Sequence, residues 1–216
     1  MAILKFPNPR ISTPEGIVAI GGDLDPESLI LAYSQGIFPW PIEGLPLTWF
    51  CPPQRAILEF KHLHISQSLK RSRKKSPFLF TIDQSFKKVI EECAKTPRPN
   101  QEGTWITPQI IDSYCTLHKL GHAHSIEVWN ETQLVGGLYG VASSGAFAAE
   151  SMFHHEANAS KLAILFLLEH LYTRQLDWID IQVMTPHMQA LGAQLISRDE
   201  FLTKLAETQA LKSDLF

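Results

Sequence analysis

Two polar motifs in otherwise apolar segments are the strongest candidates for chemistry in this sequence. Glu150 falls inside the apolar run 147–153, and Asp180 and Gln182 alternate with the aliphatic residues of a second run. A carboxylate in such a run costs free energy unless it is hydrogen-bonded or faces a wet cleft. Alternation with period two places Asp180 and Gln182 on one face of a strand, where the acid can orient the amide. The simpler interpretation, the solvated side of a sheet, stays open for each motif.

A cationic cluster is the second chemical feature. The segment 70–75 carries five positive charges, on Lys70, Arg71, Arg73, Lys74 and Lys75. Removing them from the 19 basic residues leaves 14 against 22 acidic ones, a remainder of −8 for the rest of the chain. Affinity for a phosphate backbone depends on the cations in contact and not on the net charge of −3. The cluster therefore indicates a nucleic-acid contact, with a solvated helix end as the alternative.

Other motifs carry weaker signals. Cys115, His118, His122 and His124 have a spacing that suits zinc, but Gly121 is expected to end their helix and turn the last histidine away. Surface and turn histidines are therefore favoured over a metal site. No G-x-S-x-G nucleophile motif, Walker loop or G-x-G-x-x-G motif occurs in the sequence.

The hydrophobic pattern predicts an α+β chain that positions these residues. The expected helices cover 26–35, 66–74, 84–94, 108–120, 158–172 and 187–191, with one more at the C-terminal end. The expected strands cover 56–60, 78–82, 125–129, 134–142, 146–153, 178–183 and 193–196. The three central strands follow one another through short turns, so they predict an antiparallel meander. The glycines 136, 137 and 140 within it indicate a close backbone approach or a bulge.

Composition bounds the class of protein. The chain has 216 residues, 44% of them hydrophobic and 19% charged, which excludes a disordered or fibrous protein. Three cysteines without a C-x-x-C pair favour the reducing cytosol over a disulfide framework. The apolar run Leu162–Leu168 is far shorter than the roughly 20 residues of a membrane span, and no export signal is apparent at the N-terminus. A Pro- and Gly-rich segment, 1–56, predicts a small N-terminal domain, followed by a larger domain over 57–216.

A series of short motifs occurs in one order along nearly the whole chain. They are Gly21–Leu24, Ala32–Tyr33, Gly36–Trp40, Gly103–Ile106, Leu117–Trp129, Leu134–Gly140, Glu150–Phe153, Asn158–Lys161 and Leu191–Ala193. With these motifs the chain resembles the bacterial leucyl/phenylalanyl-tRNA–protein transferases from about residue 7 to residue 205.

The resemblance implies a cytoplasmic enzyme whose larger domain has the GCN5-related N-acetyltransferase fold. It implies transfer of Leu or Phe, and less well Met, from aminoacyl-tRNA to proteins that begin with Arg or Lys, which marks them for N-end-rule degradation. It also implies that no cofactor or metal is needed, that no membrane is a partner, and that the enzyme is a monomer.

The resemblance also assigns roles to residues of this sequence. Trp40 and Trp105 match tryptophans at the site for the terminal adenosine of the tRNA, and the 70–75 cluster matches the tRNA-contacting patch. Glu150 matches a carboxylate at the aminoacyl ester, and Asp180 and Gln182 match the pair at the reaction centre. The apolar pocket for the amino-acid side chain is assigned to Leu138, Phe147, Leu167 and Ile179.

Several positions depart from the family pattern and bear on the acceptor cleft. Trp49-Phe50 replaces two tryptophans, and residues 51–54 differ from the usual Ser-Pro-Asp-Pro. Ile181 stands where a Cys is common, which argues against a nucleophilic Cys there, and the His154-His155 pair is unusual.

The residues lead to a mechanistic hypothesis with two rivals. The carbonyl of Gln182, held by Asp180, accepts a hydrogen bond from the attacking amine while Glu150 orients the activated donor. A coenzyme A-dependent N-acetyltransferase would need a Gly-rich pyrophosphate loop, but residues 155–160 read His-Glu-Ala-Asn-Ala-Ser. A non-catalytic RNA-binding module would have no use for the three polar residues together.

Overall fold

Helices and strands alternate along the chain in this computed structural model, which describes residues 2–42, 44–97 and 104–216. The helices are α1 (Pro26–Ser34), α2 (Gln67–Lys75), α3 (Phe86–Lys95), α4 (Pro108–Lys119), α5 (Ala159–Tyr172), α6 (Pro186–Ala190) and α7 (Arg198–Ala210). The strands are β1 (Ile17–Ile20), β2 (Phe38–Pro39), β3 (Thr48–Phe50), β4 (Gln54–Glu59), β5 (Leu79–Ile82), β6 (Ala123–Asn130), β7 (Gln133–Ser143), β8 (Ala146–His154), β9 (Trp178–Gln182) and β10 (Gln194–Ser197). Two 3-10 turns, Pro9–Ile11 and Phe60–His62, complete the elements. The α+β class predicted from the sequence is confirmed.

Polar residues cap the first turn of several helices. The hydroxyls of Ser66 and Thr107 accept hydrogen bonds from the first turns of α2 and α4, at 3.2 and 3.3 Å. Ser197 and Glu200 form a reciprocal capping box at the start of α7. Asn158 precedes α5 with a left-handed backbone and makes no side-chain cap.

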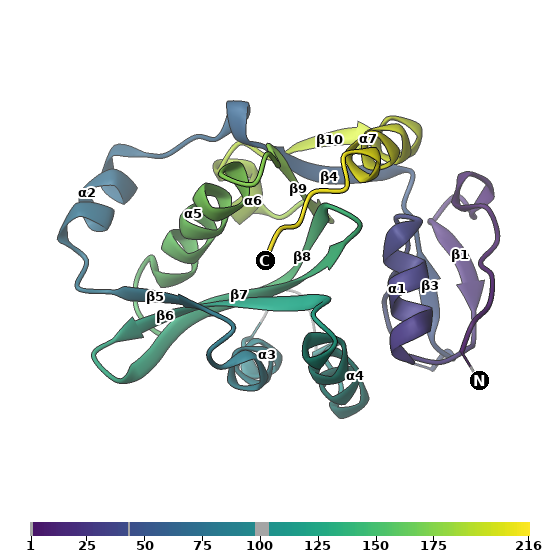
Figure 1. The fold of residues 1–216 in the computed structure, drawn as a ribbon, viewed down its shortest axis with the longest axis horizontal. Coiled ribbons are helices and arrows are strands. Elements are labelled where there is room, and N and C mark those ends of the chain that lie inside the picture. Colours follow the sequence, from purple (N-terminus) through teal and green to yellow (C-terminus); the bar gives the residue numbers. More distant parts are fainter. Residues whose placement is uncertain (1, 43, 98–103) are drawn as a thin grey trace.

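The strands form two sheets, shown in Figure 1. A small sheet has the order β1-β3-β2, and a seven-stranded sheet has the order β10-β4-β9-β8-β7-β6-β5. Strands β6, β7 and β8 form the predicted antiparallel meander, whereas β8 and β9 run parallel. The three short strands of the small sheet were not predicted from the sequence.

Helices cover both faces of the large sheet. Leu138 and Tyr139 are neighbours on β7, so their side chains point to opposite faces. Leu138 packs in the cluster that contains α5, and Tyr139 packs in the cluster that contains α3 and α4. In Figure 1, α5 accordingly lies on the other side of the sheet from α3 and α4. The second cluster also takes in the small sheet and α1, so the N-terminal elements share a core with the large sheet.

The glycines of β7 allow the close approach that the sequence predicts. A Cβ atom on Gly136 would lie 2.6 Å from the Cβ of Ala159, the first residue of α5. A Cβ on Gly140 would collide with the carbonyl oxygen of Ala148 on β8. Both positions thus require glycine for packing and not for a phosphate loop.

Two sequence expectations fall outside the part of the chain that the structure describes. They are the Pro-rich loop at Pro99 and the Gly103 end of the Gly103–Ile106 motif. Of the helices that are described, none has both the length and the apolar character that a bilayer crossing requires.

Candidate active site

A cavity opens where β8 and β9 separate. Among the described residues these two strands are paired at one position, Ala148 with Asp180. Beyond it lies a cavity of about 580 Å³, with β8 and β9 supplying opposite parts of its wall. The wall also includes Trp40, Leu138 of β7, and residues of α5 and α6. A gap between two strands of one sheet therefore becomes a binding site.

Glu150 stands at the cavity because β8 carries a bulge. Tyr139 of β7 pairs with Ser151 and Gly140 pairs with Ala149, so Glu150 is the extra residue between them. Its Oε1 atom accepts hydrogen bonds from the Tyr33 hydroxyl at 2.6 Å and from Gln182 Nε2 at 2.7 Å. Its Oε2 atom is buried and has no hydrogen-bond partner among the described residues. Glu150 therefore keeps one acceptor free at the cavity wall.

The ionisation of Glu150 is strongly perturbed. Burial raises the pKa of this carboxyl to about 7, against the hydrogen bonds from Tyr33 and Gln182, which lower it. Glu127 provides a contrast within the same sheet. It is 0% exposed, but its two oxygens accept from the hydroxyls of Thr81 and Ser125 and from the two backbone N–H groups that precede α3. Glu127 is thus a satisfied structural carboxylate, and Glu150 is not.

Gln182 is held by its backbone and its side chain separately. Its N–H donates to Asp180 Oδ1 at 2.9 Å, and its φ angle of 62° turns the chain at the end of β9. Its side-chain Nε2 donates to Glu150, so the amide orientation is set by that carboxylate. The prediction that Asp180 fixes the amide directly is wrong. Asp180 fixes the backbone, and Glu150 fixes the side chain.

Asp180 forms a buried ion pair that the sequence analysis missed. Arg55 Nε and Nη2 donate to the two Asp180 oxygens at 2.8 and 2.6 Å. The Arg55 side chain is 1% exposed and its guanidinium lies between the rings of Phe38 and Phe201, 4.6 and 4.4 Å from their centroids. The bidentate pair between β4 and β9 therefore anchors the strand that carries Gln182. The signal in the sequence that could have indicated this ion pair was the charged Arg55 beside the apolar run of β4.

Two tyrosines complete the network and were also missed. The hydroxyls of Tyr33 on α1 and Tyr114 on α4 lie 2.5 Å apart. Burial and the neighbouring Glu150 raise the pKa of both well above its ordinary value, so both hydroxyls stay protonated. Tyrosines on the apolar faces of helices look like core residues in a sequence, so no pattern marked them.

The two predicted tryptophans stack on each other. Their ring centroids are 5.6 Å apart and their planes differ by 17°. Trp40 lines the cavity, whereas Trp105 is 4% exposed and is not among the residues of the cavity wall. The structure thus places Trp40 at the site and Trp105 behind it.

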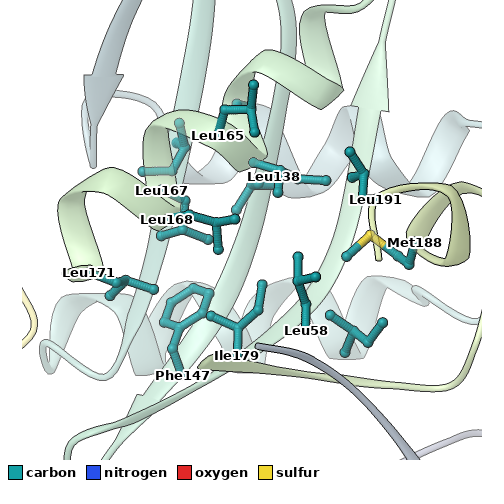
Figure 2. Packing of buried hydrophobic residues seen from close by; sticks show 14 of the residues in the cluster. Leu58, Leu138, Phe147, Leu165, Leu167, Leu168, Leu171, Ile179, Met188 and Leu191 are labelled. Atoms are coloured by element: carbon teal, nitrogen blue, oxygen red, sulfur yellow. The ribbon is translucent and has the colours of Figure 1, made fainter. Parts of the chain in front are cut away.

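Three of the four predicted pocket residues line the apolar depth of the cavity. Leu138, Leu167 and Ile179 meet there from β7, α5 and β9, with Met188 of α6 beside them (Figure 2). Phe147 is the exception. It precedes the point where β8 and β9 part, and it packs 5.6 Å from the Phe216 ring in the closed part of the sheet.

The predicted cationic cluster forms one helix. α2 carries Lys70, Arg71, Arg73, Lys74 and Lys75, all exposed, at one edge of the molecule (Figure 1). Arg73 is paired with Glu169 of α5 at 2.5 Å, and Ser72 accepts a hydrogen bond from Asn158 just before α5. Contacts to α5 therefore connect the cationic helix to one wall of the cavity.

The Cys115–His124 segment is bonded to the protein itself. His118 Nδ1 lies 2.7 Å from the carbonyl oxygen of Ala123, and His124 Nδ1 lies 2.7 Å from Asp83 Oδ2. Among the described residues, no group of three His, Cys, Asp or Glu side chains is arranged to hold a metal ion.

The arrangement suits group transfer. The apolar depth can hold the side chain of a donor, while Glu150 in the cavity wall is hydrogen-bonded to Gln182, which is buried and is not itself among the residues of that wall. The comparisons with known proteins assign the protein to the transferases. More specifically, the family profile described as leucyl/phenylalanyl-tRNA protein transferase matches residues 57–206, and that of its N-terminal domain matches residues 22–53. The chain belongs to this family of aminoacyltransferases.

Individual relatives carry the same family name. A leucyl/phenylalanyl-tRNA–protein transferase of Shewanella sp. (strain W3-18-1) is 50% identical over 204 residues, which cover 94% of this chain and 86% of the relative. One from Maridesulfovibrio salexigens is 46% identical over 203 residues, covering 94% and 85%. One from Lawsonia intracellularis is 48% identical over 202 residues, covering 94% and 89%.

Solved structures resemble the chain only distantly. A functionally unknown conserved protein from Staphylococcus epidermidis has a TM-score of 0.44 and 10% identity, covering 67% of this chain and 57% of its own. L-PGS from Bacillus licheniformis has a TM-score of 0.42 and 12% identity, covering 74% and 52%. Likeness at this level carries no argument about the site.

Proposed function

We propose that this enzyme transfers leucine or phenylalanine, and less well methionine, from aminoacyl-tRNA to the α-amine of proteins that begin with Arg or Lys. This reaction marks the acceptor for N-end-rule degradation in the cytoplasm. The observation that carries the proposal is the hydrogen bond from Gln182 Nε2 to Oε1 of Glu150, a residue of the wall of an apolar cavity, in a chain of this family.

The donor needs little chemical activation. Its amino acid is already bound to the ribose as an ester, so the protein has mainly to align an amine with a carbonyl carbon. A new C–N bond forms, the ester C–O bond breaks, and the amine proton goes to the released ribose oxygen. An α-amine has a pKa near 7.7–8.0, so roughly a tenth to a sixth of its molecules are neutral at pH 7. A weak proton acceptor is therefore enough.

Gln182 is the proposed acceptor of the hydrogen bond from the attacking amine. Because its Nε2 donates to Glu150, its Oε1 faces away from that carboxylate and is able to accept. Arg55 and Asp180 hold the backbone from which this amide extends. The free Oε2 of Glu150 accepts from the donor, either from its α-amino group or from the ribose hydroxyl.

The apolar depth explains the proposed donor preference. Leucine, phenylalanine and methionine are unbranched at Cβ, and the walls formed by Leu138, Leu167 and Ile179 are themselves flexible aliphatic side chains. A misplaced methylene changes the free energy by only about 1–3 kcal/mol, so one slot can serve three donors. The stacked pair of Trp40 and Trp105 is proposed to receive the terminal adenine.

We also propose the domain division and the fold family of the larger part. The small domain takes residues 1–56 and the larger domain 57–216, in agreement with family profiles that match 22–53 and 57–206. Strand β4 begins at Gln54 and belongs to the large sheet, so the proposed boundary falls within this strand. The antiparallel meander followed by a diverging parallel strand supports a GCN5-related N-acetyltransferase fold.

The deciding experiment measures peptide-bond formation from charged Leu-tRNA to a peptide that begins with Arg, with and without acetyl-coenzyme A. We expect leucyl transfer that is independent of acetyl-coenzyme A. Acetylation of the peptide would indicate an acetyltransferase, and tRNA binding without any transfer would indicate an RNA-binding module.

A second measurement tests the role of the amide. Gln182→Ala should lose transfer while keeping its affinity for tRNA, and Gln194→Ala, a change at an exposed glutamine on β10, is the matched control. Normal transfer by Gln182→Ala would show that the amide takes no part.

A further inference from the structure

One end of the cavity is polar and has no role in the mechanism above. His154 at the end of β8, Ser160 in the first turn of α5, and His187 of α6 all line the cavity wall there. They come from three separate elements and converge only because β8 and β9 part. The mechanism uses other residues of the cavity wall, Glu150 and Trp40.

His187 carries an unused hydrogen-bonding atom. Its Nε2 is buried and has no hydrogen-bond partner among the described residues. A buried polar atom without a partner costs free energy, so its persistence at a cavity wall points to a ligand. The nearby Ser160 hydroxyl and His154 Nδ1 lie 3.4 Å apart, which leaves His154 Nε2 available on the other side of the ring.

The polar groups of this end can donate hydrogen bonds. Burial lowers the pKa of His187, and the charges of Lys161 and His154 act in the same direction. The neighbouring Glu156 accepts a hydrogen bond from Asn130 on β6 at 2.9 Å. The polar end thus presents two imidazoles and a hydroxyl in the cavity wall, which are donors that suit an anion, and Lys161 acts electrostatically on His187.

The position of this end in the fold indicates which anion would bind there. Asn158, two residues before Ser160, donates to Ser72 of the cationic helix α2 at 3.2 Å. A chain that crosses the cations of α2 would therefore reach the cavity at this end. The proposed acceptors begin with Arg or Lys, and their positive charge makes them poor occupants of an end that offers hydrogen-bond donors under the electrostatic influence of Lys161.

On this basis we propose that His154, Ser160 and His187 form a subsite for the phosphodiester on the 5′ side of the terminal adenosine of the donor RNA. The subsite rests on the proposed function. It completes the placement of the donor, with the amino-acid side chain in the apolar depth, the adenine at Trp40, and the phosphate at the histidines.

The test uses two unreactive donor analogues, in which phenylalanine is joined to 3′-amino-adenosine through an amide. One analogue carries a 5′-phosphate and the other does not. Calorimetry should show that the wild-type protein binds the phosphorylated analogue about tenfold more tightly, the effect of one charge-assisted hydrogen bond. His187→Ala should remove this preference and leave the affinity for the unphosphorylated analogue unchanged.

Two matched variants sharpen the test. His187→Gln keeps an N–H donor near the same place and should restore part of the preference. His122→Ala, at a histidine that does not line this cavity, should behave as wild type. Binding without a phosphate preference in the wild type, no binding of either analogue, or a full preference in His187→Ala would each overturn the subsite.

The same preparations are assayed for transfer from charged Leu-tRNA to the Arg peptide. Transfer by a wild-type protein that lacks the phosphate preference would refute the subsite alone. Loss of transfer in the wild type would refute the proposed function.

Discussion

Replacing Glu150 by Gln tests the central electrostatic feature of the site. The substitution keeps the shape of the side chain and an Oε1 that can accept from Tyr33 and Gln182, but it removes the ionisation. Any cost of the new buried amide is the same at every pH. The difference in pH dependence between the two proteins therefore isolates the carboxyl group.

The expected magnitude follows from the raised pKa. Burial raises the pKa of Glu150 from 4.5 to about 7, and each pH unit corresponds to 1.36 kcal/mol. Between these two values the folded protein keeps the proton that the unfolded chain has lost, so stability falls as the pH rises. The wild type should thus lose about 3 kcal/mol of unfolding free energy through this group between about pH 4.5 and about pH 8.

Urea unfolding at several pH values measures this contribution. Over that pH range, the unfolding free energy of the wild type should fall by about 3 kcal/mol more than that of Glu150→Gln. Glu207→Gln, at an exposed glutamate on α7, is the control and should follow the wild type. Parallel pH profiles for the wild type and Glu150→Gln would refute the reasoning, because they would mean that Glu150 ionises normally in the folded protein.

Three further predictions concern the ion pair, the cavity and the cationic helix. Asp180→Asn should lower the unfolding free energy by about 3–5 kcal/mol, because it leaves Arg55 buried without a counter-charge. Asp199→Asn, at an exposed site, is the control and should have little effect. Urea unfolding measures both variants, and equal stabilities for the two would contradict this prediction. Leu138→Trp should fill the apolar depth and lower the use of Phe-tRNA in a transfer assay more than it lowers tRNA affinity, and equal losses would count against the pocket. Neutralising the last two lysines of α2 should weaken tRNA binding and flatten its salt dependence in a binding titration, while an unchanged slope would place the tRNA elsewhere.

Local patterns in the sequence were sufficient to predict most elements. The amphipathic helices and alternating strands of the large sheet lie within a few residues of their predicted ranges, because periodicity and capping residues are local properties. The three strands of the small sheet, Ile17–Ile20, Phe38–Pro39 and Thr48–Phe50, are too short to show a period.

Contacts between distant segments could not be predicted. Arg55 and Asp180 are 125 residues apart, and their pairing depends on β4 lying beside β9. The bulge at Glu150 shifts the alternation of β8, so that Phe147 and Met152 share a face although they differ by an odd number of positions. Simple alternation cannot locate such a shift. Phe147 was assigned to the pocket by the resemblance, which does not reveal that this residue precedes the point where β8 and β9 part.

The guanidinium between Phe38 and Phe201 has a consequence for how the enzyme is made. Phe38 comes from the small sheet and Phe201 from α7, so groups synthesised early and late enclose the same cation. A nascent polypeptide still lacking α7 would leave that cation open to water on the side that Phe201 covers. Activity should therefore appear only after α7 has been synthesised, and products of protein synthesis that are truncated before α7 should be inert toward the charged tRNAs that surround them.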